Sequence, residues 1–227
     1  TRIGGLFILR STRRLYRQVG SAARIPTART YPRGKGTCSL PSQAPFKPRL
    51  WNADYSQLEL RIFASVTGTR WMIETYMDPN GDIHAATGER VFGIPKAQQT
   101  PTMRVKAKTL NFGMAYGAEG ENVEEQIMTN ALRYPELEIR VPSLQECKDM
   151  VKQFWRAAPE AMEWKNAVVE IVRERGFSET LYGRRRYLPH IRSGNSELRS
   201  HAARQAVNHV IQGTAADIIK MAALLIY

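Results

Sequence analysis

The run from Thr102 to Gly117, TMRVKAKTLNFGMAYG, constrains the fold more than any other part of the sequence. Within it, Arg104, Lys108, Phe112 and Tyr116 recur at every fourth position. Four residues make slightly more than one helical turn, so these side chains share one slowly drifting helix face. The face presents two cations and then two aromatic rings. This order suits a triphosphate lying beside a sugar or a nucleobase.

A second interpretation of this run is an ordinary helix with solvated basic residues and two aromatic side chains in the core. For an isolated helix that interpretation is the commoner one. The segment DYSQLELR at residues 54–61 favours the first, because residues 50–55 predict a buried strand that ends near Asp54, followed by a helix. A carboxylate placed between a strand and a helix is typical of phosphoryl-transfer sites that hold Mg²⁺.

The rest of the chain predicts an α+β fold that is mostly helical. Breaks at Thr67–Gly68, at the turn 78–81 and at Pro159 separate the periodic segments. We expect helices over residues 57–66, 84–91, 102–116, 144–157, 159–175 and 197–226, and a hairpin-like stretch over 176–188.

The net charge of +12 comes almost entirely from the first 50 residues, which hold eleven Lys or Arg and no Asp or Glu. The remaining residues hold 33 − 11 = 22 basic and 21 acidic side chains. Such a block is usually a disordered basic arm. The chain has no apolar run long enough to span a membrane and only two cysteines, so a reducing, cytoplasmic setting is expected.

Five segments together resemble the family A DNA polymerases, whose best-known members are the bacterial DNA polymerases I. DYSQLELR resembles motif A of that family, and RVKAKTLNFGMAYG resembles motif B. Three further blocks follow in the family's order: DIHAATGERVFG (82–93), TLYGRRRYLP (180–189) and VIQGTAADIIK (210–220). The resemblance implies a partial palm, with one strand of an antiparallel sheet plus helices, and a helical fingers subdomain.

The resemblance implies that Asp54 is a carboxylate ligand of two catalytic Mg²⁺ ions, with the backbone carbonyl of Tyr55 as a second ligand. Arg104, Lys108 and His84 would bind the incoming triphosphate. Lys108 would also serve as the acid for the leaving pyrophosphate. For His84, a local hydrogen-bonding role is the alternative interpretation.

The aromatic side chains and the motif A helix would select the substrate. Phe112 would stack near the sugar and base, and Tyr116 would lie beside the templating base. Glu59 would occupy the space that a ribose 2′-hydroxyl needs, and Gln57 would lie beside the nascent pair. The run 184–186 is either a solvated loop or a contact to the template backbone.

The last helix places Arg204, Asn208 and Gln212 four residues apart, and the resemblance implies that they contact the primer–template. Such side chains can donate to minor-groove acceptors that all correct base pairs share, so they test pair geometry without reading sequence. The family more often has proline where this chain has Val210.

Motif C, which supplies the second metal-binding aspartate of the family, is not found in the sequence. We therefore expect a truncated, inactive portion of a polymerase without a thumb or an exonuclease domain. The expected divisions are residues 39–69 of the palm with motif A, 70–190 of the fingers with the nucleotide-binding helix 102–117, and a palm helix, 191–227, that contacts primer–template.

The expected activity is template-directed DNA synthesis, in which a primer 3′-hydroxyl attacks a deoxynucleoside triphosphate by a two-metal mechanism. The expected partners are primer–template DNA and dNTPs, in a bacterial or phage-like protein with no membrane association. The alternatives are a non-catalytic DNA- or nucleotide-binding remnant and a single-subunit RNA polymerase. Glu59 and the ending NFGMAYG argue against the RNA polymerase.

Residues 1–38 predict a translation out of frame. When each codon is built from the third base of one codon and the first two of the next, residues 6–13 can encode IHPSFNQ and residues 16–24 can encode STGRLSSQ. Residues 24–32 can encode NPN, one mismatched residue and QNIP. These are the family's segments before motif A, in the family's order. A genuine basic arm is the alternative.

Overall fold

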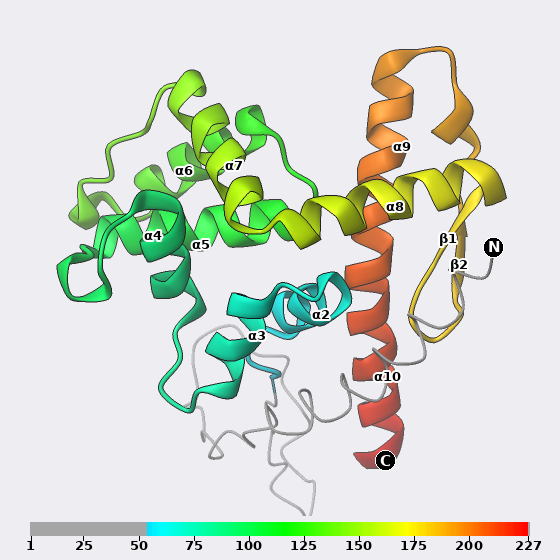
Figure 1. Cartoon of the computed structure of the whole chain (residues 1–227), viewed down its shortest axis with the longest axis horizontal. Coiled ribbons are helices and arrows are strands. Elements are labelled where there is room, and N and C mark those ends of the chain that lie inside the picture. The colour runs from blue at the N-terminus through cyan, green and yellow to red at the C-terminus, as the bar shows by residue number, and fades with distance from the viewer. Residues whose placement is uncertain (1–53, 227) are drawn as a thin grey trace, which may run out of the picture.

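The computed structural model describes residues 54–226, and this part of the chain is mostly helical with one two-stranded antiparallel sheet, as the α+β prediction expects (Figure 1). The predicted strand 50–55 lies outside these residues except for Asp54 and Tyr55, and so does the segment 1–38. Within 54–226 no helix combines the length and apolarity needed to cross a bilayer. The helices are α2 (Leu58–Thr67), α3 (Arg70–Met77), α4 (Ile83–Phe92), α5 (Pro101–Ala115), α6 (Gly120–Arg133), α7 (Leu144–Ala157), α8 (Pro159–Arg175), α9 (Ser196–Asn208), the π-helical segment η4 (His209–Gly213) and α10 (Thr214–Ile226).

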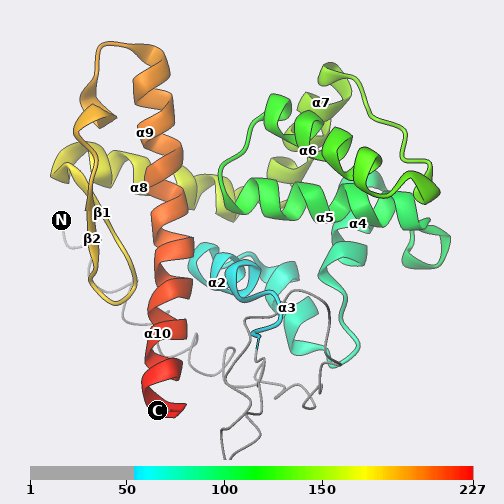
Figure 2. The ribbon, with the colours of Figure 1, turned by 180° about the vertical axis from the view of Figure 1, so that it is seen from behind.

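The helices form two groups that α8 connects. α4, α5, α6 and α7 lie together on one side, and α9, η4 and α10 form one long rod on the other (Figure 1). α8 runs from the first group and crosses the rod, while α2 and α3 lie below it, between the two groups (Figure 2). This arrangement brings α2 against both α5 and η4, so the two motif segments lie side by side.

Local capping explains why the sequence predicts several helix ends well. The hydroxyl of Thr100 accepts a hydrogen bond from the backbone N–H of Met103 at 3.3 Å, and Pro101 occupies the first turn of α5. Ser143 and Glu146 form a reciprocal capping box at the start of α7. The predictions of helices over 102–116 and 144–157 are therefore confirmed.

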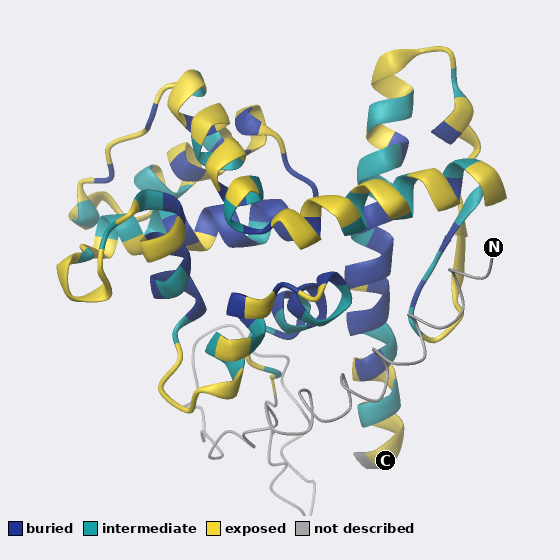
Figure 3. Cartoon of the chain, in the orientation of Figure 1, coloured by how far each residue is buried: buried dark blue, intermediate teal, exposed yellow. Residues whose placement is uncertain are grey.

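A shared hydrophobic core holds α2, α5, α7 and η4 together. Among its fully buried side chains are Leu60, Phe63, Leu110, Phe154 and Ile211. In Figure 3 the colour for buried residues runs along much of α2 and α5 and through the middle of the long rod. Full burial of such a side chain stabilises a fold by roughly 1.5–3 kcal/mol relative to exposure. The core therefore fixes the position of motif B relative to motif A.

A short hairpin, β1 (Phe177–Glu179) and β2 (Arg185–Tyr187), follows α8, as predicted. It packs along the rod through polar contacts. Thr180 donates to the Asp217 carboxylate at 2.7 Å, and Arg184 binds both Asp217, at 2.7 Å, and the Gly213 carbonyl, at 2.8 Å. Arg184 therefore serves the fold in this structure, and the solvated-loop interpretation does not apply to it.

The last helix differs from the uninterrupted helix predicted over 197–226. α9 ends at Asn208, and the π-helical segment His209–Gly213 precedes α10. π-helical turns often occur at functional sites. Gly213 allows this turn to approach the hairpin closely, because a Cβ at this position would lie 2.6 Å from Cγ2 of Thr180.

Candidate active site

The predicted face of α5 exists, and its two ends differ in exposure. Arg104 and Lys108 are exposed, whereas Phe112 and Tyr116 are half-buried. The ring centroids of Phe112 and Tyr116 lie 6.3 Å apart, and that of His84 lies 6.2 Å from Phe112. The face thus runs from a solvent-accessible cationic end to an aromatic end that packs against α2 and α4.

The guanidinium of Arg104 forms an ion pair with the carboxylate of Asp82. The other oxygen of Asp82 caps α4 and accepts from the backbone N–H groups of His84, at 3.0 Å, and Ala85, at 3.3 Å. Burial raises the pKa of Asp82, but the hydrogen bonds from Arg104 and from the backbone outweigh it and hold the pKa below its usual value. The sequence alone does not predict Asp82 as a site residue.

His84 is buried, and both of its ring nitrogens have protein partners. Nδ1 lies 3.1 Å from Nδ2 of Asn111, and Nε2 lies 3.4 Å from Nε2 of Gln57. Asn111 is itself held by the Thr87 hydroxyl at 2.8 Å. In this structure His84 therefore has the local hydrogen-bonding role that the sequence left open as an alternative.

The surroundings of His84 keep its ring neutral near pH 7. Burial lowers the pKa most, the carboxylate of Asp82 opposes it, and the cations of Arg104 and Lys108 lower it further, to about 4. A neutral imidazole accepts at only one of its two nitrogens, so one of the facing amides, that of Asn111 or that of Gln57, can donate to it. Because its ring is neutral, His84 contributes no formal charge to the cationic end of the face.

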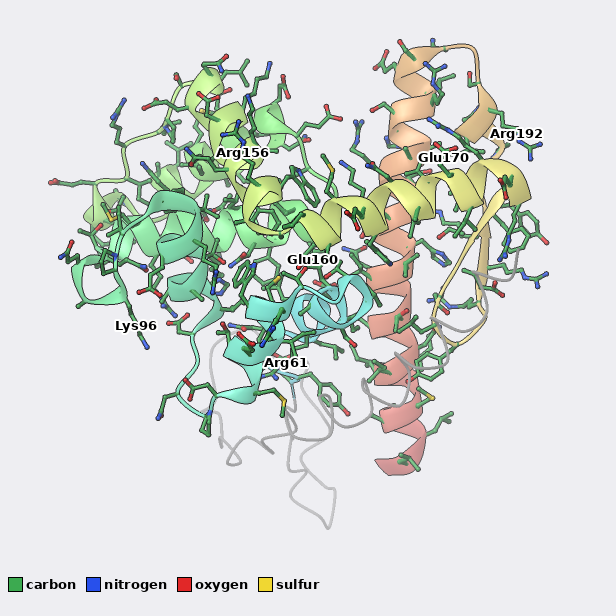
Figure 4. All side chains as sticks on the ribbon, viewed as in Figure 1. Arg61, Lys96, Arg156, Glu160, Glu170 and Arg192 are labelled. Atoms are coloured by element: carbon green, nitrogen blue, oxygen red, sulfur yellow. The ribbon has the colours of Figure 1, made fainter. Side chains whose placement is uncertain are left out.

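Gln57 has a strained backbone, with φ 54° and ψ 39° in the left-handed region that favours glycine. Its side chain accepts a hydrogen bond from the Tyr76 hydroxyl at 3.2 Å. The Arg61 guanidinium lies 4.4 Å from the centroid of the Tyr76 ring. Figure 4 labels Arg61, which extends from α2. A non-glycine residue keeps such a conformation only where its surroundings hold it, as the contacts of the Gln57 side chain with Tyr76 and His84 do here.

Glu59, Tyr116 and Gln212 connect three elements of the site. The Tyr116 hydroxyl donates to the Glu59 carboxylate, and Tyr116 also has a side-chain hydrogen bond with Gln212. Burial raises the pKa of Tyr116, and Glu59 raises it further because a carboxylate disfavours a neighbouring phenolate. The predicted substrate residues on α2 and α5 therefore meet a predicted DNA-binding residue on η4.

The other two members of the predicted DNA-binding stripe lie farther along the rod. Arg204 donates to Glu119 at 3.1 Å and to Ser200 at 2.9 Å. The side-chain oxygen of Asn208 is buried and has no hydrogen-bond partner among the described residues. An unpaired buried acceptor is costly, and the described residues supply no donor for this oxygen.

Asp54 is an exposed residue at the start of the described segment, and Tyr55 beside it is half-buried. Between residues 54 and 226 no group of three or more His, Cys, Asp and Glu side chains is arranged to hold a metal ion. Mg²⁺ is commonly held by one or two carboxylates together with substrate phosphates. The donors of Asp54 and Tyr55 fit such a shared site, although they do not form a closed one.

Known proteins similar to this chain are DNA polymerases. DNA polymerase I of Caldicellulosiruptor bescii is 36% identical over 178 residues, which is 78% of this chain and 19% of the relative. The thermostable DNA polymerase I of Thermus aquaticus is 34% identical over 77% of this chain and 19% of the relative. The chain spans about a fifth of the length of these relatives.

A solved structure shares the fold. It is the POL domain of Pol1 from M. smegmatis in complex with DNA primer–template and dNTP, which matches with a TM-score of 0.60 and 34% identity over 74% of this chain and 27% of that chain. The model of the family "DNA polymerase family A" matches residues 12–227. Because this match covers nearly the whole sequence, the chain belongs to DNA polymerase family A.

Proposed function

We propose that this chain forms the dNTP-binding portion of a template-directed DNA polymerase, which transfers a deoxynucleotide to a primer 3′-hydroxyl. The observation that carries the proposal is the face of α5. Its two cations are exposed, and at its other end Phe112 packs beside Tyr116, which bonds to Glu59 on α2. The similar M. smegmatis domain is described with primer–template and dNTP, which supports the same ligands here.

In this proposal Arg104 and Lys108 bind the triphosphate, and Lys108 donates a proton to the leaving pyrophosphate. Exposed cations at one end of a rigid helix can make charge-assisted bonds to phosphate oxygens without leaving a buried charge unpaired. His84 would join them only after exchanging its bond with Gln57. Phe112 stacks near the sugar and base.

Glu59 and Gln57 lie at the first turn of α2 and define the space for the sugar and the nascent pair. Glu59 excludes a 2′-hydroxyl by its bulk, and its bond to Tyr116 keeps the carboxylate in place. Tyr116 lies beside the templating base, and its bond to Gln212 supports a link to the primer–template. Arg204, Asn208 and Gln212 then contact the minor groove.

The metal-binding role falls to Asp54 and the backbone carbonyl of Tyr55. Two Mg²⁺ ions, when bound, would activate the primer 3′-hydroxyl and stabilise the leaving pyrophosphate. The second aspartate that the family uses belongs to motif C, which the 227 residues do not contain. We therefore propose that a polypeptide of these residues alone does not extend a primer.

The experiment compares binding with catalysis in the purified 227-residue chain. We expect retention of a labelled dNTP that Arg104→Ala and Lys108→Ala both weaken, with no Mg²⁺-dependent primer extension. Unchanged dNTP retention in both variants would remove α5 from the site. Measurable extension would refute the inactivity, whereas binding without synthesis in a complete protein that also carries motif C would favour the non-catalytic remnant.

Residues 1–38 are proposed to be out of frame, residues 39–69 and 191–227 to belong to the palm, and 70–190 to the fingers. The family match begins at residue 12, so it includes most of the segment that is proposed to be out of frame. Resequencing of the coding region, with peptide mass spectrometry of the expressed protein, decides. If the reading frame is uninterrupted and peptides from residues 1–38 are detected in the protein, the proposal is wrong.

A further inference from the structure

One of the two exposed cations on α5 is already neutralised. Arg104 is paired with Asp82, and the side chains are 51% and 23% exposed. Lys108, one turn later, has no ion pair with any residue between 54 and 226. Of the two cations proposed to bind a triphosphate, Lys108 is free of an ion pair within residues 54–226, and Arg104 must first give up its bond to Asp82.

Asp82 is held in place independently of Arg104. One carboxylate oxygen accepts from the backbone N–H groups of His84 and Ala85 at the start of α4, and the other faces Arg104. When Arg104 turns toward another anion, Asp82 cannot follow, because leaving would uncap α4. The carboxylate thus marks a fixed position where a negatively charged oxygen fits against Arg104.

We infer that Asp82 is an internal competitor, which occupies the phosphate-binding position of Arg104 when no nucleotide is bound and is displaced by the triphosphate. This inference rests on the proposed function, since it requires Arg104 to bind phosphate. Arg104 changes its partner from the Asp82 carboxylate to a phosphate oxygen. The cap of α4 remains intact during the exchange.

The exchange favours the triphosphate because a partly exposed ion pair contributes little. A triphosphate carries several charged oxygens and can engage Lys108 at the same time. Without nucleotide, the pair occupies the Arg104 guanidinium, and an anion must break it before it can bind there. Asp82 therefore lowers the affinity of Arg104 for each anion that competes with it.

The test measures binding of inorganic tripolyphosphate to the 227-residue chain by calorimetry, at low salt and without divalent metals. Asp82→Asn removes the charge, and asparagine caps helices as well as aspartate does. We expect a Kd about two- to fivefold lower than that of the wild type, the size of a partly exposed ion pair. An unchanged melting temperature will show that the cap survives.

Asp78→Asn is the matched control, because Asp78 is exposed, lies in the same connection before α4 and accepts a backbone bond from Asn80 at 2.9 Å. It removes the same charge without touching Arg104, so its Kd should stay near the wild-type value. In an Arg104→Ala background, Asp82→Asn should have no effect, since the two residues act through one contact.

Each combination of results either supports or overturns the inference. A lower Kd for Asp82→Asn that disappears in the Arg104→Ala background supports the competitor. An unchanged Kd for Asp82→Asn, or an equally lowered Kd for Asp78→Asn, overturns the inference. If Arg104→Ala still raises the Kd in that case, the proposed function stands. Unchanged binding in Arg104→Ala itself removes Arg104 from the site, and the inference then fails together with that assignment.

Discussion

The Tyr116 hydroxyl, at the end of α5, donates a hydrogen bond to the carboxylate of Glu59 in the first turn of α2. The two residues are 57 positions apart in the sequence. Motif B is therefore tied to motif A by a side-chain bond as well as by the hydrophobic core. A carboxylate held in this way has little freedom to move aside for a bulkier sugar.

Glu59→Ala should raise ribonucleotide incorporation in a complete polymerase that carries this segment, because the space for a 2′-hydroxyl opens. Glu59→Gln retains the bulk and still accepts from Tyr116, so it should discriminate nearly as the wild type does. The measurement is the ratio of kcat/KM for a ribonucleotide to that for the matching deoxynucleotide. The same ratio in the alanine and glutamine variants would show that bulk at this position is not what excludes the ribose.

Phe112→Tyr should improve the use of dideoxynucleotides by the same polymerase. Phe112 is half-buried between the rings of His84 and Tyr116 and has no hydroxyl to offer a substrate that lacks its own 3′-hydroxyl. Incorporation of each dideoxynucleotide is compared with that of the deoxynucleotide, so that a general loss of activity cancels. Equal ratios in both forms would contradict this role of Phe112.

Acid should destabilise the chain partly through His84. Its pKa is about 4 in the folded chain and about 6.5 when unfolded. Between these values the unfolded state binds more protons, so the free energy of unfolding falls as the pH drops from about 6.5 to 4, by up to about 3 kcal/mol. Denaturant titrations across this range should show a smaller fall in the free energy of unfolding for His84→Asn than for the wild type. A wild-type slope in His84→Asn would contradict the assignment.

Gly213→Ala should destabilise the fold although alanine is the better helix former. The added Cβ would lie 2.6 Å from the Thr180 side chain and 3.2 Å from the Arg184 guanidinium. Relief of such overlap typically costs about 1–3 kcal/mol, more than the roughly 1 kcal/mol that the change gains in helix propensity. Gly194→Ala, which meets nothing within 4 Å, is the control. Urea midpoints that rise or stay constant for Gly213→Ala would show that the turn relaxes freely.

Elements with strong local signals could be predicted from the sequence. Thr100 with Pro101, Ser143 with Glu146, and Pro159 with Gly176 fix the ends of α5, α7 and α8 to within a residue or two. α3 and α6 were not predicted. α3 has only eight residues and no side-chain cap, and α6 begins at a glycine and exposes Met128 and Leu132 to solvent. α3 was missed because it is short and has no capping side chain, and α6 was missed because its apolar residues do not form one buried stripe.

The site residues that define the α5 face could be found by their spacing, but their partners could not. Asp82 meets Arg104 across 22 residues and Tyr116 meets Glu59 across 57, and no local pattern encodes such pairs. The π-helical segment is hidden for a similar reason. Gly213 in this segment lies close to Thr180 and Arg184 of the hairpin, and a helical period within the last helix does not reveal that approach.

Lys108 on α5 is proposed to stabilise the phosphates during nucleotide transfer. This role is tested most directly by the single-turnover rate of correct dNTP incorporation in a complete polymerase that carries this segment. Lys108→Ala should slow that step about 100- to 1,000-fold, the usual effect of removing one charge stabiliser from an active site. Lys106 is the matched control, because its charge acts on Glu146 and Cys147 of α7, whose pKa values it lowers. The Lys106→Ala enzyme should incorporate the dNTP at nearly the wild-type rate. Equal rates for Lys108→Ala and Lys106→Ala would contradict the account.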